Sequence, residues 1–123
     1  MKYNINHEYV SISSQFATHR IILIHGWGAD ADDLLPIGKE ISEETNFNFE
    51  IISLRAPGLH PTNDGRQWYD LFPHDWNKAD YEVNKLLLTL KEFDTNQIPL
   101  KKTSLFGFSP VSYTHLRAHE TFA

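Results

Sequence analysis

The stretch RIILIHGWG, residues 20–28, is the strongest indication of the fold in this chain. Its first part, Arg20 to His25, is a short and nearly unbroken run of β-branched and aliphatic residues, which Gly26 ends. Such a run is typical of a strand that is buried on both faces of a parallel sheet. The sequence therefore predicts a central strand here, followed by a glycine turn.

A helix is expected directly after this turn. Asp32 or Asp33 can cap its start, and Pro36 is tolerable only within its first turn. The buried face of this helix is predicted from apolar residues at helical spacing, namely Leu34, Ile37 and Ile41.

Two more apolar runs, Phe49 to Leu54 and Thr103 to Phe108, also predict buried strands. Between them, from Asp80 to Phe93, apolar residues keep the i, i+3, i+4, i+7 rhythm of a helix. Glu8 to Ser13 predicts an edge strand with one wetter face, and Pro57 to Asn77 predicts a long loop whose aromatic residues argue against disorder. Strands that alternate with helices indicate an α/β fold around a mostly parallel sheet.

The composition describes a globular chain and excludes several classes of function. Of the 123 residues, 41% are hydrophobic and 13% aromatic, which is enough to build a core. The formal net charge of −5 leaves little basic surface for nucleic acid. Without cysteine, disulfides and thiolate metal sites are excluded. Apolar runs are too short to span a bilayer, so we expect a cytoplasmic protein without stable membrane insertion.

Gly107-Phe108-Ser109 follows the third predicted strand and is the first motif that could carry chemistry. A serine hydroxyl is a weak nucleophile, and a sharp turn between strand and helix gives it the exposed position that catalysis needs. In the alternative interpretation, Ser109 only caps a helix that begins at Pro110.

His25-Gly26-Trp27-Gly28 follows the first predicted strand and is the second motif. Glycines let the backbone approach a ligand here, and an N–H aimed at that ligand can stabilise an oxyanion. Alternatively, Gly26, Gly28 and Ala31 fit the dinucleotide fingerprint G-x-G-x-x-A. Because Arg55, and no acidic residue, follows the second strand, this alternative describes an NADP-binding domain.

Three segments, LIHGWGADADDLLP (23–36), LRAPGLHPTNDGRQWYDL (54–71) and SLFGFS (104–109), together resemble the phospholipase/carboxylesterase family of α/β-hydrolases. This family includes small esterases and acyl-protein thioesterases. The resemblance implies the amino-terminal part of an α/β-hydrolase fold. It also implies a serine hydrolase without a cofactor, whose substrate is a small-molecule or lipid ester or thioester.

The same resemblance assigns roles to individual residues. Ser109 matches the nucleophile, and Trp27 matches the residue whose backbone N–H forms half of the oxyanion hole. The candidates for the substrate cleft are His25, Gly26, Gly28, Trp68 and Tyr69.

Other residues have plainer interpretations. His25 is expected to be a structural histidine rather than a base. The aromatic residues Trp68, Tyr69 and Trp76 fit a core as well as they fit a pocket wall. The acidic residues Asp30, Asp32 and Asp33 are expected to act as helix caps and solvated charge rather than as a metal site.

The family pattern breaks after Ser109. The second oxyanion donor is the N–H of the following residue, and Pro110 has none. The remaining residues contain His115, His119 and Glu120 but no Asp, and the histidines are too close to Ser109 to complete a triad.

We therefore expect two parts, 1–109 as the amino-terminal portion of a hydrolase domain and 110–123 as a non-native tail. The segment PVSYTHLRAHET, residues 110–121, resembles a translated sequencing adapter. The chain as written is expected to be inactive, and a non-catalytic fragment remains an alternative beside the NADP-binding domain.

Overall fold

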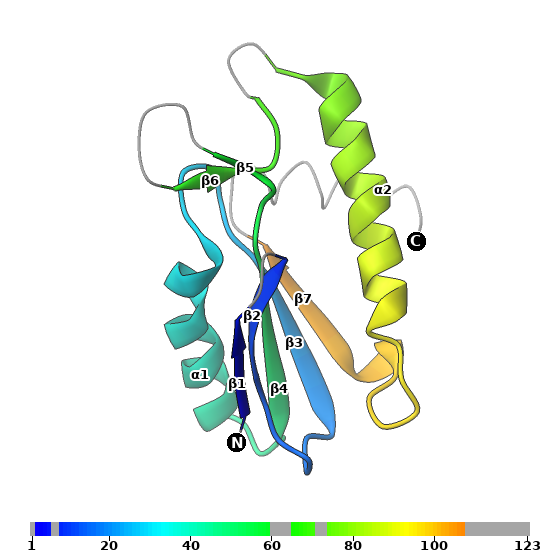
Figure 1. Ribbon diagram of the computed structural model, residues 1–123. Helices are drawn as coiled ribbons and strands as arrows, with labels where there is room; N and C mark the ends of the chain where they lie inside the picture. Colours follow the sequence, from blue (N-terminus) through cyan, green and yellow to red (C-terminus); the bar gives the residue numbers. More distant parts are fainter. Residues whose placement is uncertain (1, 6–7, 60–64, 71–73, 108–123) are drawn as a thin grey trace.

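The computed structural model describes residues 2–5, 8–59, 65–70 and 74–107, and the expected α/β architecture is confirmed. Its five-stranded sheet has the order β1-β2-β4-β3-β7 (Figure 1). The strands are, in that order, β1 (Lys2–Ile5), β2 (Tyr9–Ser13), β4 (Phe49–Leu54), β3 (His19–Ile24) and β7 (Thr103–Gly107). β4, β3 and β7 run parallel, whereas β2 and β1 are added antiparallel.

Helices lie on both sides of the sheet (Figure 1). On one side, the 3₁₀ helix η1 (Ala31–Leu34) leads directly into α1 (Leu35–Glu43). On the other side runs α2 (Trp76–Glu92), and the short 3₁₀ helix η2 (Leu100–Lys102) precedes β7. In the part of the chain that the structure describes, no helix has both the length and the apolar content to cross a membrane.

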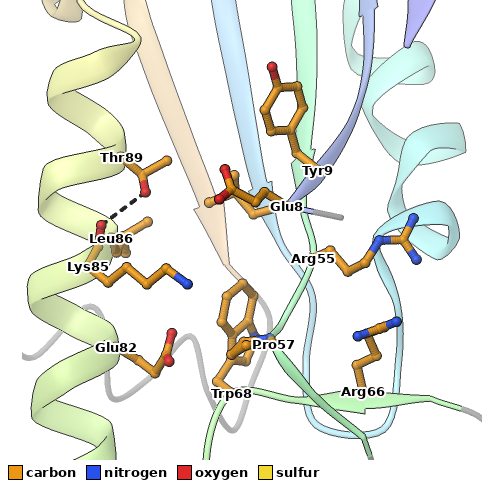
Figure 2. A pocket seen from close by; sticks show the side chains of 11 residues that line it. Glu8, Tyr9, Arg55, Pro57, Arg66, Trp68, Glu82, Lys85, Leu86 and Thr89 are labelled. Carbon is orange, nitrogen blue, oxygen red and sulfur yellow. Dashed lines mark hydrogen bonds between the residues drawn. The ribbon is translucent and has the colours of Figure 1, made fainter. Parts of the chain in front are cut away.

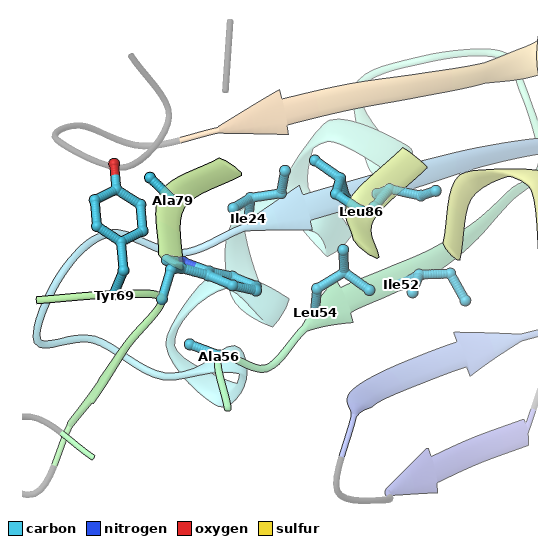
Figure 3. Packing of buried hydrophobic residues seen from close by; sticks show 9 residues of the cluster. Ile24, Ile52, Leu54, Ala56, Tyr69, Ala79 and Leu86 are labelled. Atoms are coloured by element: carbon cyan, nitrogen blue, oxygen red, sulfur yellow. The ribbon is translucent and has the colours of Figure 1, made fainter. Parts of the chain in front are cut away.

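Alternate residues of the central strands build two cores, one on each face of the sheet. Odd-numbered residues such as Ile21, Leu23 and Ile51 pack with η1 and α1. Even-numbered residues such as Ile22 and Ile52 pack with α2, and Figure 3 shows the cluster on this face. The side-chain period of two in a strand explains why β3 and β4, buried on both faces, read as continuous apolar runs.

Two expectations about the first half of the chain are wrong. β2 is an inner strand, because β1 adds beyond it and forms the edge; Val10, Ser11 and Ile12 are all buried. The cap at the helix start is Asp30, whose carboxylate accepts from the Ala31 N–H at 2.6 Å.

The apolar face of α1 also differs from the expected one. Leu35 and Gly38 are buried, whereas Ile37 is 37% exposed. The intervening 3₁₀ turn causes this shift, because it changes which residues face the sheet at the start of α1.

The expected long loop is shorter than predicted. Its middle pairs as a small antiparallel ribbon of β5 (Gly58–Leu59) and β6 (Arg66–Gln67). Its end belongs to α2, which begins at Trp76 because the Asp75 carboxylate caps it by accepting from the Lys78 N–H at 3.0 Å.

Candidate active site

The turn from Gly26 to Ala29 leaves the carboxyl end of β3 and forms the centre of the site. The Ala29 N–H donates to the Gly26 carbonyl at 3.2 Å, which closes the turn. Gly28 has φ of 88°, a conformation that the third position of a type II turn requires and that favours glycine. Trp27, the residue that we expect to supply an oxyanion donor, occupies the second position of this turn.

His25 is fully buried at the base of the turn. Its Nδ1 lies 2.8 Å from the Gly26 carbonyl oxygen, and its Nε2 lies 3.0 Å from the Ala56 backbone nitrogen. A carbonyl can only accept and an N–H can only donate, so Nδ1 carries the proton and Nε2 accepts. Burial lowers the pKa of His25 and favours this neutral ring. Both ring nitrogens are occupied, which agrees with a structural histidine.

Trp68 packs directly against His25. The two rings stack with their centroids 5.1 Å apart, and the Trp68 indole N–H donates to the His25 carbonyl at 2.8 Å. Trp68 is 7% exposed and Tyr69 is 2% exposed, so both belong to the core cluster on the α2 side.

Strand β6 of the small ribbon forms hydrogen bonds with the turn from Gly26 to Ala29. The Gly28 N–H donates to the Arg66 carbonyl and the Arg66 N–H donates to the Ala29 carbonyl, both at 2.8 Å. The Trp27 indole N–H donates to Gln67 Oε1 at 2.8 Å, and Gln67 Nε2 donates to an Asp70 carboxylate oxygen at 2.8 Å.

The acidic residues after the turn act as caps and ion-pair partners. Asp30 and Asp33 form a reciprocal capping box at the start of η1. Arg55 lies 3.0 Å from the Asp30 carboxylate and 3.8 Å from that of Asp32. Among the described residues, no group of histidines and carboxylates could hold a metal ion. Arg55, the residue that would bind a 2′-phosphate in a dinucleotide site, is thus paired with carboxylates.

A cavity of about 320 Å³ opens between α2 and the end of β4 (Figure 2). Trp68 lines it, while its ring also stacks on His25. Glu82 of α2 points into the cavity with a side chain that is only 3% exposed, and its Oε1 lies 3.2 Å from Lys78 Nζ. The lining mixes apolar and charged groups, chiefly Leu54, Pro57, Trp68, Glu82, Lys85 and Leu86.

The structure thus brings five of the predicted site residues together: His25, Gly26, Trp27, Gly28 and Trp68. Tyr69 is adjacent in sequence but faces the core, where its hydroxyl has no hydrogen-bond partner among the described residues. Ser109 lies outside the described residues.

The contacts of Gln67 and Asp70 are not predictable from the sequence. The segment from Arg66 to Asp70 is recognisable in the sequence as part of the family resemblance. Its hydrogen bonds to the turn, however, depend on the pairing of β5 with β6, which local spacing does not reveal.

Comparisons with known proteins agree with the fold. The sequence model of the family described as Phospholipase/Carboxylesterase matches residues 5–113. The crystal structure of a carboxylesterase from Mesorhizobium loti is similar, with a TM-score of 0.68 and 17% sequence identity. That similarity covers 90% of this chain and 54% of the carboxylesterase, and at this identity it concerns the fold alone. No curated protein matches the chain in sequence.

Proposed function

Because the chain belongs to the phospholipase/carboxylesterase family, we propose that it supplies the nucleophile and half of the oxyanion hole of a serine hydrolase for carboxylic esters or thioesters. Ser109 is the nucleophile in this proposal, and the Trp27 backbone N–H is the first oxyanion donor. The substrate is a small-molecule or lipid ester, and the location is cytoplasmic.

The register between β3 and β7 is the observation that carries the proposal. These strands are parallel neighbours, and Ile24 lies opposite Gly107. The turn that contains Trp27 begins at Gly26, two residues after Ile24, and in the sequence Ser109 follows Gly107 by two residues. β3 and β7 therefore end at the same edge of the sheet, where ligands bind in open α/β sheets, and in the sequence each of these strands is followed within a few residues by one of the two motifs.

The proposed reaction is an acyl transfer in which Ser109 is the nucleophile and the Trp27 backbone N–H is an oxyanion donor. The Ser109 hydroxyl oxygen attacks the acyl carbonyl, a histidine base takes its proton, and the carbonyl oxygen becomes an oxyanion. Backbone N–H groups stabilise this charge, which develops only on the way to the tetrahedral intermediate. Collapse of the intermediate expels the alcohol or thiol, which takes its proton from the histidine. Water, deprotonated by the same histidine, then attacks the acyl-enzyme, and the acid and the free Ser109 hydroxyl are released.

We also propose that the native polypeptide continues beyond Ser109 with the acid and the histidine of the triad. The chain spans 54% of the similar carboxylesterase. Pro110 has no N–H to serve as the second donor, and no Asp follows Ser109. In this proposal residues 110–123 are a non-native tail, and the 123-residue chain is inactive by itself.

The test is hydrolysis of p-nitrophenyl esters and of acyl thioesters by the full-length protein encoded at the source locus. We expect turnover that Ser109→Ala reduces by at least about 10³-fold, because it removes the nucleophile. A source locus that encodes this same tail and stop, or a full-length protein without hydrolysis of either class, would contradict the proposal.

A further inference from the structure

We propose that Gln67 and Asp70 are positioning residues for the oxyanion turn. Together with the Trp27 indole they form a chain of two hydrogen bonds, which we call the Gln67 relay: Trp27 Nε1 to Gln67 Oε1, and Gln67 Nε2 to Asp70 Oδ1, each 2.8 Å long. This inference rests on the proposed function, because it concerns the residue that we assign as the first oxyanion donor.

The chemistry of the three groups makes the relay directional. An indole N–H can only donate and a carboxylate can only accept, whereas an amide has one side of each kind. Gln67 therefore satisfies both neighbours in only one orientation, with its oxygen toward Trp27 and its NH₂ toward Asp70. Asp70 thereby fixes the amide that holds the Trp27 side chain.

The backbone of β6 holds the same turn at two further points. Arg66 accepts from the Gly28 N–H and donates to the Ala29 carbonyl, both at 2.8 Å. β6 is itself paired with β5, where Gly58 lies opposite Gln67. One residue of β6 thus fixes the third and fourth positions of the turn through its backbone, while the next residue fixes Trp27 through its side chain.

The proposed donor N–H belongs to the Gly26–Trp27 peptide. Fixing the Trp27 side chain and the Trp27–Gly28 peptide that follows restricts rotation at Trp27, and with it the plane of the Gly26–Trp27 peptide. That plane sets the direction of the proposed oxyanion donor, which must lie about 2.7–3.1 Å from the position of the developing charge. Displacement of about 1 Å costs on the order of 10²-fold in rate. A looser turn should therefore lower kcat and leave KM nearly unchanged, because the interaction forms only in the transition state.

The first experiment tests the relay in the 123-residue chain, without any need for activity. NMR of the indole N–H protons separates Trp27 from Trp68 and Trp76. We expect Gln67→Leu to move the Trp27 resonance and to speed its exchange with solvent, while Trp68 is unaffected. Gln15→Leu, the same change at an exposed glutamine, should leave all three resonances in place. An unmoved Trp27 resonance in Gln67→Leu would overturn the relay.

The second experiment tests its effect on catalysis in the full-length protein. We expect Gln67→Leu and Asp70→Ala each to lower kcat about tenfold at unchanged KM. Asp70→Asn, which keeps an oxygen acceptor, should restore most of the rate lost in Asp70→Ala. In a Trp27→Phe background, which lacks the indole N–H, Gln67→Leu should add little, whereas a general loss of stability would add equally in both backgrounds.

The outcomes separate the two proposals. Full-length protein that hydrolyses no ester or thioester contradicts the proposed function, and with it the catalytic role of the relay. If the full-length protein is active, two results contradict the positioning role alone. In the first, Gln67→Leu leaves kcat unchanged; in the second, it lowers kcat equally in the wild-type and the Trp27→Phe backgrounds.

Discussion

His25 connects three separate segments of the chain through its ring and its carbonyl group. Its ring bridges the Gly26 carbonyl and the Ala56 N–H, and its own carbonyl accepts from Trp68. Protonation would place a second donor at Nε2, opposite the Ala56 N–H, so the contact with Ala56 requires the neutral ring. This requirement links the stability of the fold to pH.

We expect stability to rise with pH below the ordinary His pKa of about 6.5 and to level off above it. Burial lowers the pKa of His25 in the folded chain, so between the two pKa values the unfolded chain binds more protons, and stability increases with pH there. Urea unfolding at several pH values measures the slope. The slope should shrink in His25→Gln and persist in His74→Gln, an exposed histidine. Equal slopes in wild type and His25→Gln would contradict this account.

Tyr69 and Trp68 are neighbours in the core with opposite hydrogen-bonding states. The Tyr69 hydroxyl is buried without a partner among the described residues, whereas the Trp68 indole donates to His25. Tyr69→Phe should therefore be neutral or raise the free energy of unfolding by up to about 1 kcal/mol. Trp68→Phe should lower it by about 1–3 kcal/mol, because the buried His25 carbonyl loses its donor. Urea denaturation of both variants tests the contrast, which a destabilised Tyr69→Phe would contradict.

The sequence identifies some roles of single residues and misses others for a physical reason. The structural role of His25 is predictable, because a histidine between a buried strand and a glycine turn has backbone groups nearby. Gln67 is not predictable, because its partner Trp27 lies 40 positions away and meets it only after β5 and β6 pair.

At the scale of elements, α1 approaches the sheet unusually closely at Gly38. A Cβ on this residue would lie 2.6 Å from Ile51 Cγ2 and 3.0 Å from Leu23 Cδ1. Ile51 is β-branched and buried, so it has little freedom to move away. Gly38 is therefore required for packing in a helix whose backbone would otherwise favour alanine.

We expect Gly38→Ala to destabilise the fold. Overpacking costs about 1–3 kcal/mol and outweighs the gain in helix propensity of about 1 kcal/mol. Glu40→Ala, on the exposed side of α1, is the matched control and should change stability little. Chemical denaturation compares the two variants. Gly38→Ala that is more stable than wild type would show that α1 can move away from β3 and β4.

The sequence predicts elements well where an apolar run is continuous. Phe49 to Leu54 forms β4 with the expected bounds, because its residues are buried on alternate faces. The sequence predicts the position and bounds of an element less well where they depend on long-range strand pairing or on a helix cap. β2 becomes an inner strand only because β1 pairs beyond it, and η1 begins at Ala31 only because Asp30, rather than Asp32 or Asp33, caps it.

At the scale of the molecule, β7 is the edge of the sheet in the described part of the chain. Its Phe106 is 41% exposed. An open strand edge with an exposed apolar side chain favours pairing with another chain. We therefore expect the 123-residue chain to self-associate as its concentration rises, which sedimentation velocity measures.

A charge on β7 should weaken this association. Phe106→Lys places an ammonium at the edge, where a second strand would have to desolvate it. Phe16→Lys is the matched control, because Phe16 is 69% exposed but lies in the turn after β2. Association that is unchanged by Phe106→Lys, or a wild-type chain that stays monomeric, would contradict the role of this edge.

The role of Ser109 as nucleophile is tested by treating the full-length protein with a fluorophosphonate and locating the adduct by mass spectrometry. We predict a single adduct on Ser109 and no adduct in Ser109→Ala, because the reagent reacts with a serine that a base has activated. An enzyme that hydrolyses esters but carries the adduct on another residue would contradict the assignment of Ser109 and of the turn beside it.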